Sequence, residues 1–519
     1  MVLDKFYKKE KPFVGLGGYG GGIAYLGFTG DKVNSFLRAS YINDPKFSSE
    51  VALDIDSEGN VYWCYANTQY YDGSNGNQRQ QAIVEKFNPS GSLVWQKKFW
   101  GNGTLSSTIE DPEFLAIRLN NDDTYLALFA KWRPNTTNLS TIVILDTSNG
   151  DILETEYLNS GQDADNLSWT ANQNTRLILS AQQGGTGQYM YHYWITGSNK
   201  SSSPIKSIAR NDNYSKSSPY ITGIYPYDPS VTNDYRVFGT FRFNTNNSQY
   251  RIGVQSWSQN GTSPQFEYRD ENAYCEGYLG TMIAAKYQQS PLVDQYISVN
   301  NYRNGVNTRE IALMDTSSTI WARRSSGNNS DSIGKIIPAY DTSTNKVWIF
   351  AYLPGQYRRY LIAELHETTG AIVQQKMFYV NTKGGSQSNP SAFNDGATYV
   401  VRSKFRVDDT HVYFCGYSDG YGANSQVLFK LPKDLSIVSN GTYIVIKDDS
   451  GSSSPKQVEV VFETPPTLQW DDVTSGRSGL TSIDVWTSTT PPTGSLTQWT
   501  TPTIDLDETT NAITGTKLI

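Results

Sequence analysis

One unit recurs seven times along the chain, and this recurrence limits the possible folds more than any other feature of the sequence. The unit is a turn rich in Asp, Asn or Gly, followed by a compact strand of β-branched and aromatic residues. Helical periodicity is nearly absent. The strands begin at Val61, Tyr125, Leu177, Val237, Tyr296, Val347 and Val412, with spacings of 64, 52, 60, 59, 51 and 65 residues. The sequence therefore predicts an all-β protein built from seven similar units.

Each unit holds about four strands. One strand precedes the recurring strand, as at residues 51–54, and a second hairpin follows it, as at residues 83–97. Four-stranded units with this kind of period are typical of propeller blades. We therefore expect a seven-bladed β-propeller over residues 37–446, with its last strand set near residues 426–446. An array of β-sandwiches is the alternative.

The N-terminal segment, residues 1–36, has a charged start followed by a glycine-rich run over residues 15–22. A chain so rich in glycine does not pack a core of its own. We expect an extended arm that lies on a partner through Phe6, Tyr7, Phe13, Leu16 and Tyr19. The repeat is expected to begin only near Ser49, and glycine interrupts strands, so this arm is not expected to close the propeller as a latch.

The C-terminal segment, residues 447–519, is rich in Ser, Thr and Pro and carries the isolated aromatics Trp470, Trp486 and Trp499. Sparse tryptophans in a polar chain suit an extended segment that becomes ordered on a neighbouring subunit. The alternative is a plain disordered tail.

Composition excludes several classes of protein. Charged residues make up 18%, and 43 Lys and Arg stand against 50 Asp and Glu, so no concentrated basic face for nucleic acid is expected. No apolar run approaches the ~18 residues of a membrane-spanning helix. Residues 1–11 lack the layout of a secretory signal. Three scattered cysteines, Cys64, Cys275 and Cys415, do not form a disulfide framework.

The sequence offers no clear catalytic, cofactor or metal site, so none is predicted. His192, His366 and His411 lack neighbours at ligand spacing. The segment 54–59 resembles the start of a calcium loop, but the twelfth position is Tyr65 instead of Glu. The acidic pairs at 122–123 and 408–409 occupy the same turn of their units, where Asp caps turns through its side chain.

Tyrosine clusters are the one surface feature that favours binding. An exposed Tyr offers a flat apolar face and a hydrogen-bonding edge, which suits sugar rings or protein partners. Strand tyrosines also serve ordinary packing. The candidate surface residues are Tyr70, Tyr71, Tyr225, Tyr227 and Tyr421.

The first unit resembles the β-propeller repeats of tailed-bacteriophage structural proteins. Its residues 56–62, Asp-Ser-Glu-Gly-Asn-Val-Tyr, and 86–95, Lys-Phe-Asn-Pro-Ser-Gly-Ser-Leu-Val-Trp, match the motifs D-x-x-G-N-V-Y and K-[FY]-N-x-x-G-x-L-x-W. Residues 4–15 with the glycine run that follows are similar to the N-terminal segment of phage tail and virion proteins, especially those of marine phages. Later units keep the strand layout but do not keep the residues of these motifs.

The resemblance implies a non-enzymatic virion protein of the tail or adsorption apparatus: a nozzle, a knob or a fibre-associated part. Such a protein has no cofactor, is assembled in the host cytoplasm and works as a homo-oligomer that interlocks through extended termini. The implied partners are other virion proteins and copies of itself, with a host surface glycan or receptor at attachment. The alternative function is a carbohydrate-active or carbohydrate-binding β-propeller, either a polysaccharide hydrolase or lyase, or a lectin.

Overall fold

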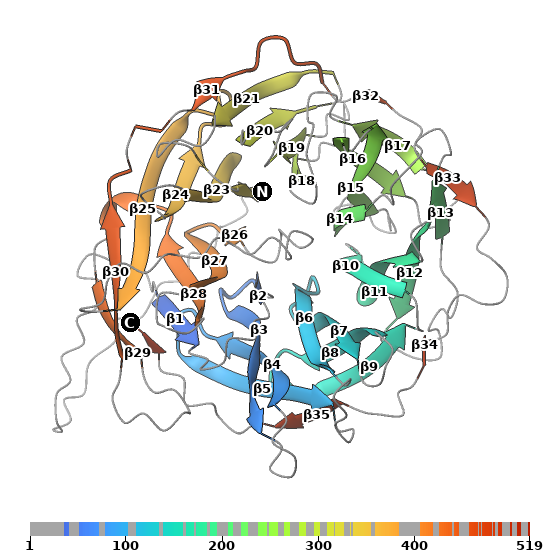
Figure 1. The fold of residues 1–519 in the computed structure, drawn as a ribbon, viewed down its shortest axis with the longest axis vertical. Helices are drawn as coiled ribbons and strands as arrows, with labels where there is room; N and C mark the ends of the chain where they lie inside the picture. The colour runs from blue at the N-terminus through green and yellow to red at the C-terminus, as the bar shows by residue number, and fades with distance from the viewer. Residues whose placement is uncertain are drawn as a thin grey trace, which may run out of the picture.

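The chain forms a β-propeller. The computed structural model contains seven antiparallel sheets arranged as blades in a ring, and each blade contacts the next (Figure 1). The structure describes residues 36–40, 51–71, 78–101, 110–133, 139–158, 162–170, 173–183, 187–194, 206–210, 220–226, 237–246, 249–257, 264–269, 280–286, 295–300, 309–315, 317–325, 333, 336–353, 359–382, 405–418, 425–438, 441–445, 456–465, 467–468, 470–479, 481–482, 486–489, 499–500, 506–509 and 517–518. Among these residues, no helix is long and apolar enough to cross a membrane.

The first four blades follow the chain in order, and each runs from an inner strand to an outer strand. Blade 1 holds β2 (Val51–Ile55), β3 (Val61–Tyr71), β4 (Gln78–Phe87) and β5 (Leu93–Gly101). Blade 2 holds β6 (Glu110–Leu119), β7 (Tyr125–Arg133), β8 (Leu139–Asp146) and β9 (Ile152–Leu158). Blade 3 holds β10 (Gln162–Thr170), β11 (Gln173–Gln183), β12 (Gly187–Trp194) and β13 (Lys206–Arg210). Blade 4 holds β14 (Tyr220–Pro226), β15 (Val237–Asn246), β16 (Gln249–Trp257) and β17 (Pro264–Arg269).

The last three blades include the strand that closes the ring. Blade 5 holds β18 (Gly280–Lys286), β19 (Gln295–Asn300), β20 (Arg309–Met314) and β21 (Thr319–Ser325). Blade 6 holds β22 (Ile336–Asp341), β23 (Lys346–Leu353), β24 (Arg359–Leu365) and β25 (Ile372–Thr382). Blade 7 holds β26 (Phe405–Val407), β27 (His411–Ser418), β28 (Ser425–Pro432) and, as its fourth strand, β1 (Phe36–Ser40).

Strand β1 corrects the sequence prediction that the repeat begins near Ser49 and has no latch. Its five residues pair with β28 in the register Phe36 to Lys430 through Ser40 to Gln426. The glycine run ends well before Phe36, so it does not interrupt this strand. The prediction for the last strand set, residues 426–446, is likewise wrong in part. A 3-10 turn, η2 (Leu435–Ile437), follows β28, and the next strand, β29 (Gly441–Val445), joins blade 6.

The C-terminal segment adds an outer strand to every blade. From blade 6 it runs through blades 5, 4, 3, 2 and 1 to blade 7. This direction is opposite to the order of the blades in the sequence, and the strands lie along the perimeter of the ring (Figure 1). We call residues 456–518 the belt. Its strands are β30 (Lys456–Glu463), β31 (Asp471–Asp472), β32 (Thr481–Ser482), β33 (Trp486–Thr489), β34 (Trp499–Thr500), β35 (Leu506–Thr509) and β36 (Lys517–Leu518). The expected extended segment thus pairs with the blades of its own chain.

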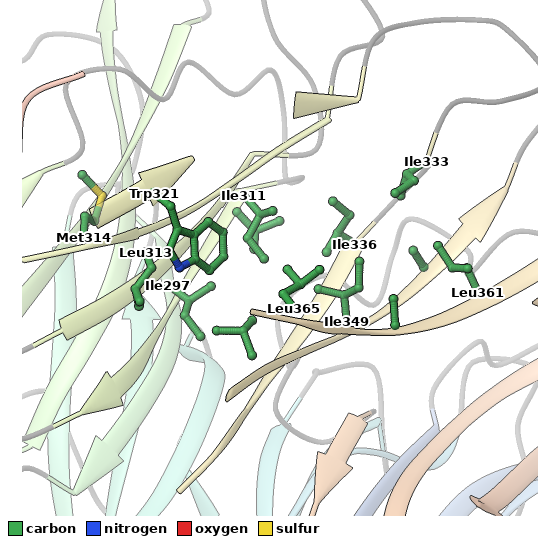
Figure 2. Packing of buried hydrophobic residues seen from close by; sticks show 14 of the residues in the cluster. Ile297, Ile311, Leu313, Met314, Trp321, Ile333, Ile336, Ile349, Leu361 and Leu365 are labelled. Carbon is green, nitrogen blue, oxygen red and sulfur yellow. The ribbon is translucent and has the colours of Figure 1, made fainter. Parts of the chain in front are cut away.

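The core lies between neighbouring blades because successive strand residues face opposite sides of a sheet. In β3, the side chains of Val61, Trp63 and Tyr65 pack toward blade 7, whereas Tyr62 and Cys64 pack toward blade 2. The same alternation in β23 separates Val347 and Ile349 from Trp348 and Phe350. Figure 2 shows the cluster between blades 5 and 6, in which Trp321 lies beside Ile311 and Leu313. Each such large buried side chain contributes roughly 1.5–3 kcal/mol.

The recurring Asp, Asn and Gly turns gather at one end of the blades. In blade 1, Val61 pairs with both Ile55 and Phe87, and Phe87 pairs with Leu93, so both turns of the blade lie at that end. We call this end the short-turn face. Its described turns are residues 56–60, 88–92, 120–124, 146–151, 315–318, 341–346, 366–371, 408–411 and 433–438.

Candidate functional site

Only some of the predicted site residues lie in the part of the chain that the structure describes. Phe6, Tyr7, Phe13, Leu16, Tyr19, Tyr227 and Tyr421 lie outside the described residues. Of Tyr70, Tyr71, Tyr225, Trp486 and Trp499, only the strand positions are described. The strand positions do not bring the tyrosines together. Tyr70 and Tyr71 are the last residues of β3, at the end of blade 1 that is farthest from the short-turn face, whereas Tyr225 lies in β14 of blade 4 at the short-turn end.

Trp470 is the predicted site residue whose side chain is described, and it lies against its own propeller. Its indole N–H donates a hydrogen bond of 2.9 Å to the carbonyl of Gly370, in a turn of blade 6. Its ring packs on the apolar cluster shared by blades 5 and 6. The tryptophan therefore anchors the belt at the seam between these two blades.

Beyond Trp470, a set of polar contacts fixes the belt on blade 5. The Thr474 hydroxyl accepts a hydrogen bond of 2.8 Å from the Ala322 amide, and the Val473 amide donates one of 3.0 Å to the Ala322 carbonyl. The Arg477 guanidinium forms a buried ion pair with Glu310, which also pairs with Arg324 at 2.8 Å. These residues set the register of the belt.

The belt then touches a turn of the short-turn face. Ser478 forms a β-bridge with Ser318, and its carbonyl accepts a hydrogen bond of 2.7 Å from the Thr319 hydroxyl. A Cβ on Gly479 would lie 2.3 Å from the Ser318 nitrogen. Only glycine allows this approach of two backbones. The sequence analysis missed Thr474, Arg477 and Gly479, and no repeat unit in the sequence marks them.

The motif that carries the family resemblance acts at the contact between blades. The Trp95 indole donates a hydrogen bond of 3.0 Å to the Thr147 carbonyl in the next blade, and a Cβ on Gly150 would lie 2.9 Å from the Trp95 ring. Lys97, two residues later, pairs with Asp151 at 2.7 Å.

The same contact recurs between blades 5 and 6. The Trp321 indole donates to the Glu367 carbonyl at 3.0 Å, and the Trp321 ring leaves no room for a Cβ on Gly370. Arg323, two residues later, donates to the Thr369 carbonyl at 2.6 and 2.9 Å. Both glycines have positive φ, 79° and 64°. In both pairs, the Trp of one blade packs on the glycine turn of the next blade and holds the two blades together.

The acidic turns are built as caps, as the sequence predicted for the pairs at 122–123 and 408–409. The Asp56 carboxylate accepts hydrogen bonds from the Glu58 and Asn60 amides at 3.1 and 2.8 Å, and from the Tyr62 hydroxyl at 3.1 Å. Asp408 repeats the arrangement in blade 7 with the amides of Thr410 and His411 and the hydroxyl of Tyr413.

Burial and hydrogen bonds shift the pKa values of Asp408, Tyr413 and Tyr340. Burial alone would raise the pKa of the Asp408 carboxyl, but hydrogen bonds from Tyr413 and two amides outweigh it and hold that pKa below its usual value. Burial and the nearby Asp408 charge raise the pKa of the Tyr413 hydroxyl. Burial, with the charges of Glu367 and Asp341, raises the pKa of Tyr340 to about 12. The Asp408 carboxylate therefore stays ionised and serves as a hydrogen-bond acceptor.

One buried carboxylate joins three blades. Asp54, on the inner strand β2, accepts a hydrogen bond of 2.9 Å from the Leu119 amide of blade 2 and pairs with Arg406 of blade 7. Its partners are structural groups of neighbouring inner strands. Within the described ranges, no three or more His, Cys, Asp or Glu side chains are placed to hold a metal ion.

No protein-family model matches the chain, and no curated protein matches it. Among solved structures, it is similar to a chain of the mitotic checkpoint complex at 10% identity and a TM-score of 0.39, over 79% of this chain and 98% of that one. Prolyl oligopeptidase B from Galerina marginata matches at 8% identity and a TM-score of 0.37, over 82% of this chain and 56% of that one. The exotype rhamnogalacturonan lyase YesX matches at 9% identity and a TM-score of 0.35, over 75% of each chain. At these identities and TM-scores, the similarities indicate no function for this chain.

Proposed function

We propose that this chain is a non-enzymatic structural component of a tailed-phage virion, in the tail or adsorption apparatus, that assembles with copies of itself and with other virion proteins. The observation that carries the proposal is the belt. It adds a strand to all seven blades and ends in blade 7, where β36 pairs with β1. Both ends of the folded chain are thereby tied into one sheet. A part that must persist outside the cell gains from such resistance to unfolding.

The first repeat unit supports the same proposal through its resemblance to phage propeller repeats. Residues 56–62 and 86–95 match the motif letters, and Asp56 and Trp95 act in the turn and in the contact between blades. The N-terminal segment 1–35 supplies a Gly-rich arm for contacts between subunits. A host surface glycan or receptor is the further partner at attachment.

The test is to look for the chain in particles. Phage particles from cultures that carry this gene are purified on a density gradient, digested and analysed by quantitative mass spectrometry. We expect the chain at a fixed ratio to the tail proteins, and gold-labelled antibody against the purified protein should mark the tail. Absence from the particles would contradict the proposal, as would release of oligosaccharides from host polysaccharide by the purified protein.

A further inference from the structure

Three of the four large apolar side chains that are exposed in the described part of the chain occupy one position of the repeat. Val94, Leu153 and Val373 are 50%, 45% and 51% exposed, and Leu93, next to Val94, is 37% exposed. Each of the first three is the bulged residue just after the second turn of its blade, in blades 1, 2 and 6. We call these four residues the rim residues. Single exposed apolar residues are ordinary, but repetition at one structural position is not.

The equivalent position in blade 5 is partly covered. Ile320 is the bulged residue there, and it packs on the cluster between blades 5 and 6. At this turn the belt contacts blade 5 through the Ser318–Ser478 bridge and the close approach of Gly479 to Ser318. An extended Ser- and Gly-containing segment of this chain therefore already occupies one of the equivalent turns.

The short-turn face is acidic. In the described turns, all the exposed charged residues are acidic: Glu58, Asp122, Asp151, Glu367, Asp409 and Asp434. A partner that suits this face carries positive charge together with apolar side chains. Residues 4–19 have this composition, with four lysines against two carboxylates and with Phe6, Tyr7, Phe13, Val14, Leu16 and Tyr19.

The chain also enters the fold at this face. Phe36, the first residue of β1, pairs with Lys430, whose ammonium donates a hydrogen bond of 2.8 Å to the Pro89 carbonyl in a turn of blade 1. Blade 7 stands between blades 6 and 1, which carry rim residues. Sixteen extended residues span up to about 50 Å, enough to pass several turns of the rim.

We propose that the rim residues and the surrounding carboxylates bind residues 4–19 from the N-terminal arm of a neighbouring copy of this chain. The proposal rests on the proposed function, which requires copies to assemble through an arm, and it names the surface that receives the arm. The lysines face the carboxylates of the turns, and the aromatic and aliphatic side chains cover Val94, Leu153 and Val373. Because the charged groups are exposed, added salt weakens the contact.

The first test is photo-crosslinking between full-length copies. A chain with benzoylphenylalanine in place of Val94 is mixed with an isotopically heavy wild-type chain, irradiated and digested. We expect cross-links to peptides from residues 1–35 of the heavy copy. Cross-links only to the arm of the same light copy, or only to other segments, would overturn the proposal, and so would a chain that stays monomeric up to about 100 μM.

The second test uses matched variants in the full-length chain. The triple variant Val94→Ser, Leu153→Ser and Val373→Ser should weaken self-association at least about tenfold in sedimentation, with an unchanged melting temperature. Ser57→Ala with Ala371→Ser, on the same face, is the control and should leave association unchanged.

Deletion of residues 1–35 should weaken self-association as much as the triple variant does. Combining the deletion with the triple variant should weaken self-association no further. Additive effects would refute the pairing of arm and rim. A chain found in virions that fails these tests refutes this inference alone, and a chain that passes them but is absent from particles refutes the proposed function alone.

Discussion

Strand β1 and the belt strand β31 both come from the ends of the chain, but they occupy different places in a blade. β1 is the fourth strand of blade 7, with five residue pairs to β28 on one side and two to β36 on the other. β31 is a fifth strand, with two residue pairs to β21 on one side, and both of its residues are exposed. The comparison indicates two levels of stabilisation: closure of the ring by the N-terminal strand, and reinforcement by the belt.

Removing β1 should have the largest effect. A chain that lacks residues 1–40 leaves β28 without its fourth-strand partner, and the belt loses the strand on which β36 pairs. We expect the apparent melting temperature to fall by more than about 10 °C, or the chain to aggregate, because blade 7 exposes an edge beside its apolar core. Differential scanning calorimetry at a fixed scan rate measures it.

The control for this deletion is a chain that lacks only residues 1–35. It keeps Phe36–Ser40, so its melting temperature should stay within a few degrees of the wild-type value. A large fall in both variants would show that the segment before β1, and not the strand, stabilises the ring.

Arg477→Met tests the belt and should have a smaller effect. Arg477 and Glu310 are both nearly buried, and Glu310 keeps Arg324 as a partner after the substitution. We expect a cost of about 2 kcal/mol, below the usual loss for breaking a buried pair. Amide hydrogen exchange should increase in residues 471–479 and β21 while the inner strands of blade 5 stay protected.

A matched control for the belt is Arg323→Met. It removes a half-buried guanidinium that donates to the Thr369 carbonyl of blade 6 and pairs with the exposed Asp472 of β31 at 3.4 Å, and these bonds do not involve residues 473–478. It should loosen the seam between blades 5 and 6 and leave the pairing of residues 473–478 in place. Equal loss of protection over the belt in both variants would contradict the separate role of Arg477.

The two levels of stabilisation differ in how far the sequence predicts them. The recurring strands were predicted well: β3, β7, β15, β19, β23 and β27 begin within one residue of the predicted starts, and β11 within four. Local turn chemistry repeats in each unit, so one unit helps to locate the next. This is why the propeller and the capping roles of Asp122 and Asp408 could be inferred from residues alone.

The terminal strands could not be placed in the same way. Lys456–Glu463 holds three valines and a phenylalanine among its eight residues, which favours a strand, yet nothing in it selects blade 6 among seven similar edges. Trp470, Arg477 and Gly479 anchor the belt on blade 5 and on its seam with blade 6, through contacts with residues at least 100 positions away. The rim residues were also missed, although the glycine turns that precede them (Gly91, Gly150 and Gly370) repeat in the sequence.

Asp408→Asn tests a turn of blade 7, and its effect on stability should depend on pH. The pKa of the Asp408 carboxyl is lowered in the folded chain, so its stabilisation is present above the unfolded pKa of about 3.9 and is lost as pH falls through the folded pKa. We expect the variant to be less stable by about 1–2 kcal/mol near pH 7, because a charge-assisted acceptor is lost. The difference should shrink between pH 4 and the lower folded pKa, as thermal melts at several pH values would show.

Asp409→Asn is the control, since this neighbouring carboxylate is exposed. It should follow the wild-type curve at each pH. A constant gap between wild type and Asp408→Asn down to low pH would mean that the substitution acts through packing and not through charge.

Thr474→Val should give the smallest effect and tests whether the belt can open locally. The substitution keeps the shape of the side chain but removes the hydroxyl that accepts from the Ala322 amide at 2.8 Å, which costs about 1 kcal/mol. Since the belt lies outside the blade core, we expect faster hydrogen exchange at Ala322 and at residues 473–478 with a melting temperature within about 2 °C of wild type. Ser475→Ala, at an exposed position next to it, should change neither quantity. If Thr474→Val instead lowers the melting temperature as much as Arg477→Met, the belt and the blade unfold as one unit, and the two levels of stabilisation are a single one.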